Sequence, residues 1–112
     1  MNNTVRVGLL ISIMFASWIA VADSRNSHEY KLGAFTGAMK YCEEKYEDEG
    51  RYKWARLRAA EEFRNMSSSE KLSYGLGRDN ANRKGQYLGN KLDGNECRSL
   101  LKLSEWKRFS KK

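Results

Sequence analysis

The clearest helical pattern in the chain is Leu32-Gly-Ala-Phe-Thr-Gly-Ala-Met-Lys-Tyr-Cys-Glu-Glu-Lys-Tyr46. Its larger apolar side chains recur at alternating steps of three and four residues, at Leu32, Phe35, Met39, Cys42 and Tyr46. This spacing places them along one face of a helix. We therefore expect the segment to form an amphipathic helix whose apolar stripe faces the core.

A second face of the same segment carries only small residues, which are Gly33, Ala34, Gly37 and Ala38. Small side chains let a neighbouring backbone approach closely, although each glycine costs a helix about 1 kcal/mol relative to alanine. Tight packing inside the protein is the interpretation that this pattern favours. A docking face for a partner is the alternative.

The rest of the chain points to the same fold class. After residue 22 there is no Val, Ile or Pro, and Thr36 is the only threonine. Strands favour β-branched residues, whereas helices favour the Ala, Leu, Glu, Lys, Arg and Met that dominate here. The composition predicts an all-α domain, a small bundle of about four helices.

Three further helices are expected after the first. A stripe of Tyr52, Ala55, Ala59, Phe63 and Met66 predicts a helix over 51–66. Ser67 and Glu70 form a capping-box pattern for a third helix that holds Leu72 and Leu76. The last helix is predicted to start near Asp93-Gly94-Asn95 and to run through Cys97, Leu100, Leu101, Leu103, Trp106 and Phe109.

The stretch from Gly75 to Gly94 has a different character, with five glycines and the polar run Arg78-Asp-Asn-Ala-Asn-Arg-Lys84. The run predicts either an exposed helix or a loop, and exposed segments rich in Arg and Asn often serve recognition. We take its polar side chains as the candidate partner-binding residues: Arg78, Asn80, Asn82, Arg83 and Lys84. A solvated connection without a binding role is the alternative, and Tyr87, Leu88 and Leu92 are expected to return the chain to the core.

The N-terminus has the layout of a signal peptide. Arg6 precedes an uncharged run from Val7 to Ala22, which ends in Ala20-Val21-Ala22 before a polar segment. The run is shorter than the roughly 20 residues of a membrane-spanning helix, so we expect cleavage after Ala22 and no stable membrane insertion of the product. The domain organisation predicted is a signal peptide over 1–22 and one helical domain over 23–112, in the periplasm or outside the cell.

Two cysteines, Cys42 and Cys97, lie in the part expected to be exported. Thiols in an oxidising compartment pair readily, so the even number predicts one disulfide. It would join the first and last helices. A metal pair or a catalytic thiol is the competing interpretation, but two cysteines and the lone His28 do not make a four-ligand zinc site or supply a second histidine as base.

The charge of the predicted domain is strongly positive. Arg6 is the only basic residue among the first 22, so residues 23–112 hold 20 of the 21 Lys and Arg against all 14 Asp and Glu, a net charge of +6. Because export argues against a nucleic-acid partner, we expect an acidic protein or an anionic component of the envelope.

Local signatures of catalysis or cofactor binding are missing from the sequence. There is no HExxH, GxSxG, P-loop or CxxC pattern, and the carboxylates over 43–49 do not follow the spacing of a calcium loop. We expect no catalytic residues, no metal site and no cofactor. An enzyme whose carboxylates, such as Glu61 and Glu62, meet only in space is the remaining possibility in that class.

The two cysteine segments, Ala38-Met39-Lys40-Tyr41-Cys42 and Cys97-Arg-Ser-Leu-Leu-Lys-Leu-Ser-Glu-Trp106, resemble those of periplasmic immunity proteins that neutralise amidase toxins of the type VI secretion system. The resemblance covers about thirty residues and implies an exported, small, helical inhibitor. A histidine often precedes the serine of that family's terminal motif, whereas Leu103 stands here. The hypotheses that follow are an exported binding or inhibitor protein of the immunity type and, as the alternative, an envelope stress chaperone or structural protein.

Overall fold

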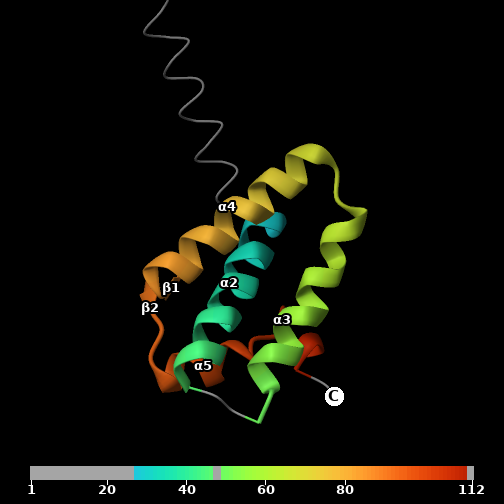
Figure 1. The fold of residues 1–112 in the computed structure, drawn as a ribbon. Coiled ribbons are helices and arrows are strands. Elements are labelled where there is room, and N and C mark those ends of the chain that lie inside the picture. The colour runs from blue at the N-terminus through green and yellow to red at the C-terminus, as the bar shows by residue number, and fades with distance from the viewer. Residues whose placement is uncertain (1–26, 47–48, 111–112) are drawn as a thin grey trace, which may run out of the picture.

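The computed structural model describes residues 27–46 and 49–110. The predicted signal peptide and its cleavage point lie outside the described residues. Within the described part the chain forms a helical bundle with one short β-hairpin (Figure 1). The predicted all-α class is confirmed.

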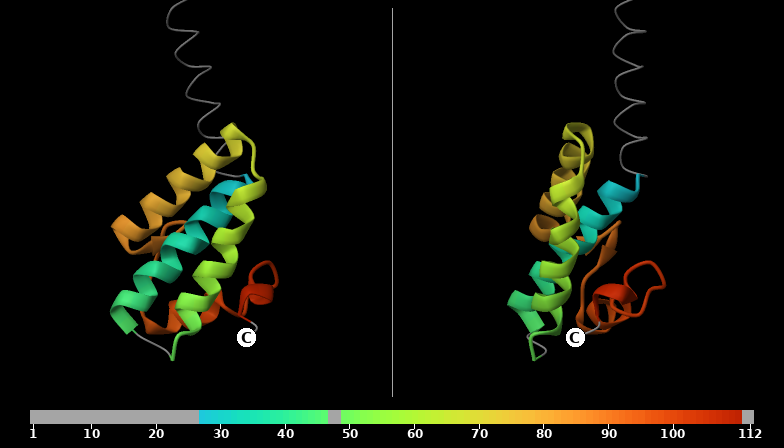
Figure 2. Two further views of the ribbon diagram at one scale, coloured as in Figure 1. Left: turned by 45° about the vertical axis from the view of Figure 1, so that its right-hand side comes forward. Right: turned by 90° about the vertical axis from the view of Figure 1, so that its right-hand side faces the viewer.

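Helix α2 (His28–Tyr46) is the centre of the fold. Ser27 begins it by accepting a hydrogen bond from the Tyr30 amide, 3.1 Å from the Ser27 hydroxyl. Helices α3 (Arg51–Glu61) and α4 (Ser68–Lys84) lie on one side of α2, and the C-terminal segment lies on the other (Figure 2). Since α2 contacts every other layer, its side chains are buried on both faces.

The small face of α2 packs against α4, as predicted. A Cβ atom built on Gly33 would lie 1.9 Å from the Tyr74 carbonyl oxygen, and one on Gly37 would lie 2.1 Å from that of Arg78. On the facing helix, a Cβ on Gly77 would lie 2.1 Å from the Tyr30 carbonyl oxygen. The two backbones are therefore too close for any side chain between them, and the alternative of a docking face at these residues is wrong.

The start of α4 follows the predicted capping box. The Ser67 hydroxyl accepts from the Glu70 amide, and the Glu70 carboxylate accepts from the Ser67 amide at 2.8 Å. The hydrogen bond that the Ser67 amide donates to the carboxylate is the main cause of a lowered pKa of Glu70. The helix then continues through the whole polar run to Lys84, so the helical alternative for that run is the correct one.

Helix α3 is followed by a single 3-10 turn, η1 (Glu62–Asn65), so the expected helix over 51–66 is confirmed in outline. After α4, Gly85 ends the helix with a φ of 64°. The chain then makes an antiparallel hairpin of β1 (Gln86–Tyr87) and β2 (Asn90–Lys91), which was not predicted.

The expectation that Leu88 packs in the core is wrong. Leu88 occupies the hairpin turn with a φ of 48° and is 45% exposed, whereas Tyr87 and Leu92 are buried as expected. Side chains alternate between opposite sides of an extended strand, and the turn follows directly after Tyr87. With Tyr87 directed to the core, Leu88 is left in solvent.

The last helix is shorter than predicted. Asp93 caps α5 (Gly94–Leu100) by accepting from the Glu96 amide at 2.8 Å, but the chain leaves the helix after Leu100. Turns then lead to a 3-10 segment, η2 (Lys107–Phe109). Because the chain turns here, Trp106 and Phe109 reach Phe35 of α2, with ring centroids 5.1 Å and 5.8 Å from it.

A disulfide joins Cys42 of α2 to Cys97 of α5, with Cα atoms 5.9 Å apart. Both cysteines are fully buried. The predicted link between the first and last helices is confirmed.

A buried hydrogen bond fixes the C-terminal segment to the hairpin. The indole N–H of Trp106 donates to the Tyr87 hydroxyl at 2.8 Å. We expect Tyr87→Phe to lower the free energy of unfolding by about 1 to 3 kcal/mol, because the indole N–H would stay buried without its acceptor. Urea denaturation measures this, with Tyr41→Phe as control, since the Tyr41 hydroxyl makes no hydrogen bond within the described residues.

The buried hydroxyl of Tyr87 should also make the stability of the fold depend on pH. Burial raises the pKa of Tyr87 to about 12, from an ordinary value of about 10. The fold therefore favours the neutral phenol, and this stability is complete below pH ~10 and lost as the pH rises from ~10 to ~12. The gap in stability between wild type and Tyr87→Phe should narrow across that range. A gap that stays constant would contradict this account.

Candidate functional site

A groove of about 360 Å³ opens between α3 and α4, with α2 as its floor. All three helices contribute to its lining, which consists of Thr36, Lys40, Arg56, Ala60, Tyr74, Arg78, Asp79 and Asn82. Figure 1 shows α3 and α4 diverging from their connection in front of α2. Side chains far apart in the sequence therefore meet at one site.

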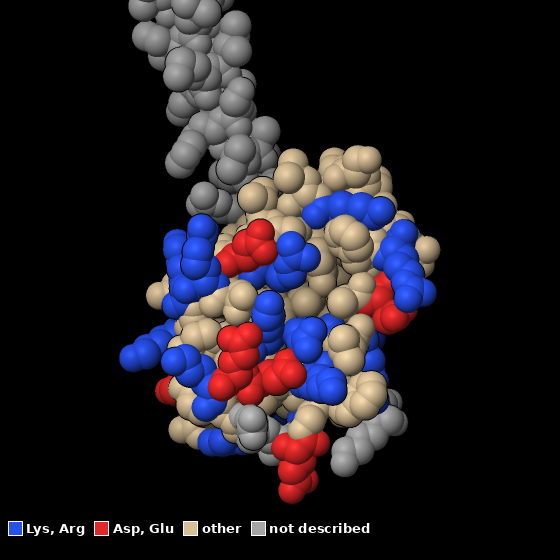
Figure 3. Space-filling view, in the orientation of Figure 1, with Lys and Arg blue, Asp and Glu red and all other residues tan. Residues whose placement is uncertain are grey.

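Positive side chains dominate the groove. Lys40 comes from α2, Arg56 from α3 and Arg78 from α4. Figure 3 views this face of the molecule, where Lys and Arg gather around its centre with a few acidic groups between them. The arrangement suits an anionic ligand.

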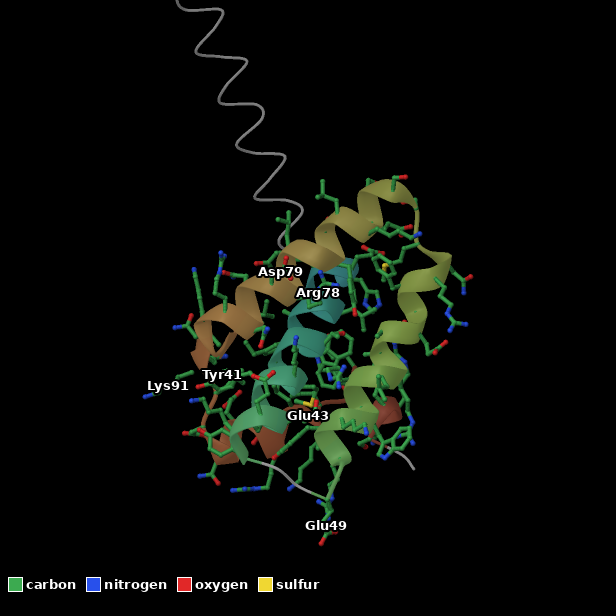
Figure 4. The ribbon with its side chains drawn as sticks, in the orientation of Figure 1. Tyr41, Glu43, Glu49, Arg78, Asp79 and Lys91 are labelled. Carbon is green, nitrogen blue, oxygen red and sulfur yellow. A yellow bond between two sulfur atoms is a disulfide. The ribbon has the colours of Figure 1, made fainter. Side chains whose placement is uncertain are left out.

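Two carboxylates hold the arginines in place. A Glu43 carboxylate oxygen lies 3.0 Å from both Nε and Nη2 of Arg56. Nε of Arg78 donates to the Asp79 carboxylate at 3.1 Å, and Figure 4 shows both of these residues on α4 with Glu43 below on α2. Lys40 is exposed and forms no ion pair with any residue of 27–46 or 49–110.

Polar groups lie at the bottom of the groove. Tyr74 and Thr36 are both almost fully buried. Burial raises the pKa of the Tyr74 phenol, while a hydrogen bond with Thr36 and then the positive charges of Arg78 and Arg56 act to lower it. Both guanidinium groups thus act on the same hydroxyl, and at neutral pH this hydroxyl keeps its proton.

Close packing of α4 on α2 determines which α4 residues reach the groove. The Arg78 backbone rests against Gly37, and Arg78 and Asn82 lie one helical turn apart on the side facing α3. Asn80 faces the other way and donates to the Tyr30 hydroxyl at 3.2 Å. Arg83 and Lys84 are exposed at the end of α4.

The structure therefore places only two of the five predicted binding residues in the groove. Arg78 and Asn82 line the groove, whereas Asn80, Arg83 and Lys84 do not. The sequence pattern missed Lys40 and Arg56, because each lies off the apolar stripe of its own helix and neither belongs to a run of polar residues. Only the helical packing brings them beside Arg78.

The carboxylates considered as possible catalytic groups lie elsewhere, in exposed ion pairs. Glu61 accepts from Arg64 at 3.4 Å, and Glu62 lies 3.0 Å from Arg108. Among residues 27–46 and 49–110, no three His, Cys, Asp or Glu side chains are grouped as metal ligands would be. In the same ranges, no helix combines the length and the apolar character that a membrane span requires.

Comparisons with protein-family models, with characterised proteins and with solved structures find no match to this chain. The groove is therefore interpreted from its own chemistry.

Proposed function

We propose that this is an exported binding protein that inhibits a partner by docking onto an acidic surface of it, as the resemblance to periplasmic immunity proteins implies. The observation that supports this most is the groove, in which three helices each supply one cation around a shared cavity. Binding, and not catalysis, is the proposed mode of action.

The scaffold suits such a role. The close contact of α2 with α4 fixes the backbones that carry Lys40 and Arg78 before a partner arrives, which reduces the entropy lost on association. A net positive domain also attracts an acidic partner and speeds its encounter. A disulfide is typical of proteins that fold in an oxidising compartment, in keeping with the proposed export.

The proposal predicts the effect of charge reversal in the groove. Lys40→Glu with Arg78→Glu should weaken partner binding by at least about tenfold, because it removes two cations and adds two repulsive charges. Arg83→Glu with Lys84→Glu makes the same change in net charge outside the groove and is the matched control. It should weaken binding much less.

The experiment begins with the tagged, oxidised protein and an envelope extract of its own host. Any protein recovered in near equal amount is identified, purified and tested for hydrolysis of cell-wall material with and without the wild type and both double variants. Stoichiometric inhibition that only the groove variant loses supports the proposal. Equal inhibition by all three forms, or capture without inhibition, would overturn it.

An envelope chaperone is the second candidate, and exposed apolar side chains favour it. Trp54 and Leu57 are 51% and 37% exposed beside a shallow hollow of α3, and Leu72 on α4 is 65% exposed. Such surface can hold unfolded clients. A chaperone would bind a hydrophobic dye and suppress the aggregation of unrelated proteins, and neither property depends on Lys40 or Arg78.

A further inference from the structure

We propose that the groove is a carboxylate-binding site, which takes one Asp or Glu side chain of the partner between Arg56, Arg78 and Lys40. This inference rests on the proposed function and specifies what the partner presents. Three observations support it: the charge balance of the groove, the free donors of the two arginines and the buried Tyr74 hydroxyl beneath them.

The charge balance favours a single negative charge. Three cations, Lys40, Arg56 and Arg78, meet two carboxylates, Glu43 and Asp79, so the cluster carries a net charge of +1. One carboxylate neutralises it. A phosphate group carries about two charges at pH 7 and would also face two carboxylates close by, so the cluster matches it poorly.

The ion pairs leave both arginines with free donors. Arg56 uses Nε and Nη2 for Glu43, and Arg78 uses Nε for Asp79. A guanidinium has five N–H groups in a planar fork, so each arginine keeps N–H groups for a second acceptor. Glu43 and Asp79 thus orient the guanidinium groups without using up their hydrogen-bonding capacity.

A neutral donor lies below the cations. Tyr74 is 2% exposed and still lines the groove, beside Thr36, whose own hydroxyl donates to the Leu32 carbonyl oxygen at 2.9 Å. By turning its proton from Thr36 to the ligand, the Tyr74 phenol would replace a hydrogen bond between neutral groups with a stronger, charge-assisted one to a carboxylate oxygen. Asn82 on the α4 wall adds a side-chain amide as a further donor.

The cavity has room for a whole side chain and not only for its charged group. A volume of about 360 Å³ holds a carboxylate together with its methylene groups and the adjoining backbone. The ligand class is therefore an acidic residue in an exposed segment of a protein.

The test is a titration followed by NMR, with the oxidised protein as isolated from cells. The probes are three end-blocked peptides, Gly-Glu-Gly, Gly-Gln-Gly and Gly-phosphoserine-Gly, and the signals are the Nε–H groups of Arg56 and Arg78 and the amide of Tyr74. We expect saturable shifts with the Glu peptide and at least about tenfold weaker binding of the Gln and phosphoserine peptides.

Two variants of α4 provide a matched pair. Arg78→Gln should weaken binding of the Glu peptide by about tenfold, and Arg83→Gln, which removes the same charge outside the groove, by less than about twofold. Both side chains are exposed, so neither change threatens the fold. Equal weakening by the two variants, equal binding of the Gln peptide or tighter binding of the phosphoserine peptide would overturn the inference.

A failure of the carboxylate site can be distinguished from a failure of the proposed inhibitor role. If the Glu peptide fails to bind but the groove double variant still loses inhibition of the partner, the carboxylate site is wrong and the inhibitor role stands. If the Glu peptide binds as expected and no partner is inhibited, the site stands and the inhibitor role is wrong.

Discussion

Replacing Cys42 and Cys97 together by alanine should lower the free energy of unfolding by about 4 kcal/mol, judged from chain entropy. The disulfide closes a loop with a sequence separation of 55 residues, so its loss frees a large part of the unfolded chain. The measurement is urea denaturation of the oxidised wild type and the double variant under the same conditions.

A reduced wild-type sample is the control for this experiment. Because reduction and substitution remove the same cross-link, reduction should give about the same loss as the double substitution, and each single substitution should behave like the double one. For a domain of this size, about 4 kcal/mol is a large share of the total stability. A loss below about 1 kcal/mol would mean that packing alone holds α5 against α2.

The second large effect is expected at the contact of α2 with α4. Gly37→Ala should lower the free energy of unfolding by about 3 kcal/mol, even though alanine favours a helix by about 1 kcal/mol over glycine. The added Cβ would lie 2.1 Å from the Arg78 carbonyl oxygen and 2.9 Å from its carbonyl carbon, and backbone atoms cannot move aside as a flexible side chain can.

Gly75→Ala is the matched control in the facing helix. The nearest atom that its Cβ would meet is a guanidinium nitrogen of Arg78 at 4.0 Å, so the substitution should stabilise the protein by up to about 1 kcal/mol. In urea denaturation, we expect the free energy of unfolding to fall for Gly37→Ala and to rise for Gly75→Ala. If Gly37→Ala were as stable as wild type, the close approach of the two helices would be wrong.

Gly37→Ala should also change the geometry of the groove. Because Gly37 lies against the backbone of Arg78, any displacement of α4 moves Arg78 relative to Lys40 and Arg56. Packing within the bundle and the geometry of the candidate site are therefore linked. Gly75 has no such contact with α2, so Gly75→Ala should leave the groove unchanged.

Local features of the chain follow directly from the sequence. The lack of Val, Ile and Pro after residue 22 indicates helices, and the Ser67 and Glu70 pair marks the start of α4. The small face of α2 and the pairing of Cys42 with Cys97 are also predictable. Each of these depends on residues near one another in the chain, on composition, or on there being one pair of cysteines.

Other features depend on contacts between distant residues, and only the tertiary structure decides them. Leu101, Leu103 and Trp106 continue a helical pattern, yet the chain turns after Leu100 because Trp106 gains more by packing on Phe35 and donating to Tyr87. The hairpin arises in the same way, since it carries Tyr87 into the core.

The candidate site belongs to this second group. Arg78 and Asn82 were predicted from a polar run, but Asn80, Arg83 and Lys84 of that run lie outside the groove, because successive helical residues point in different directions. Lys40 and Arg56 belong to other helices. The sequence by itself determined the helical class, the disulfide and the small packing face, which depend on local propensity and composition. The tertiary structure decided which cations share one cavity, because that depends on how three helices pack.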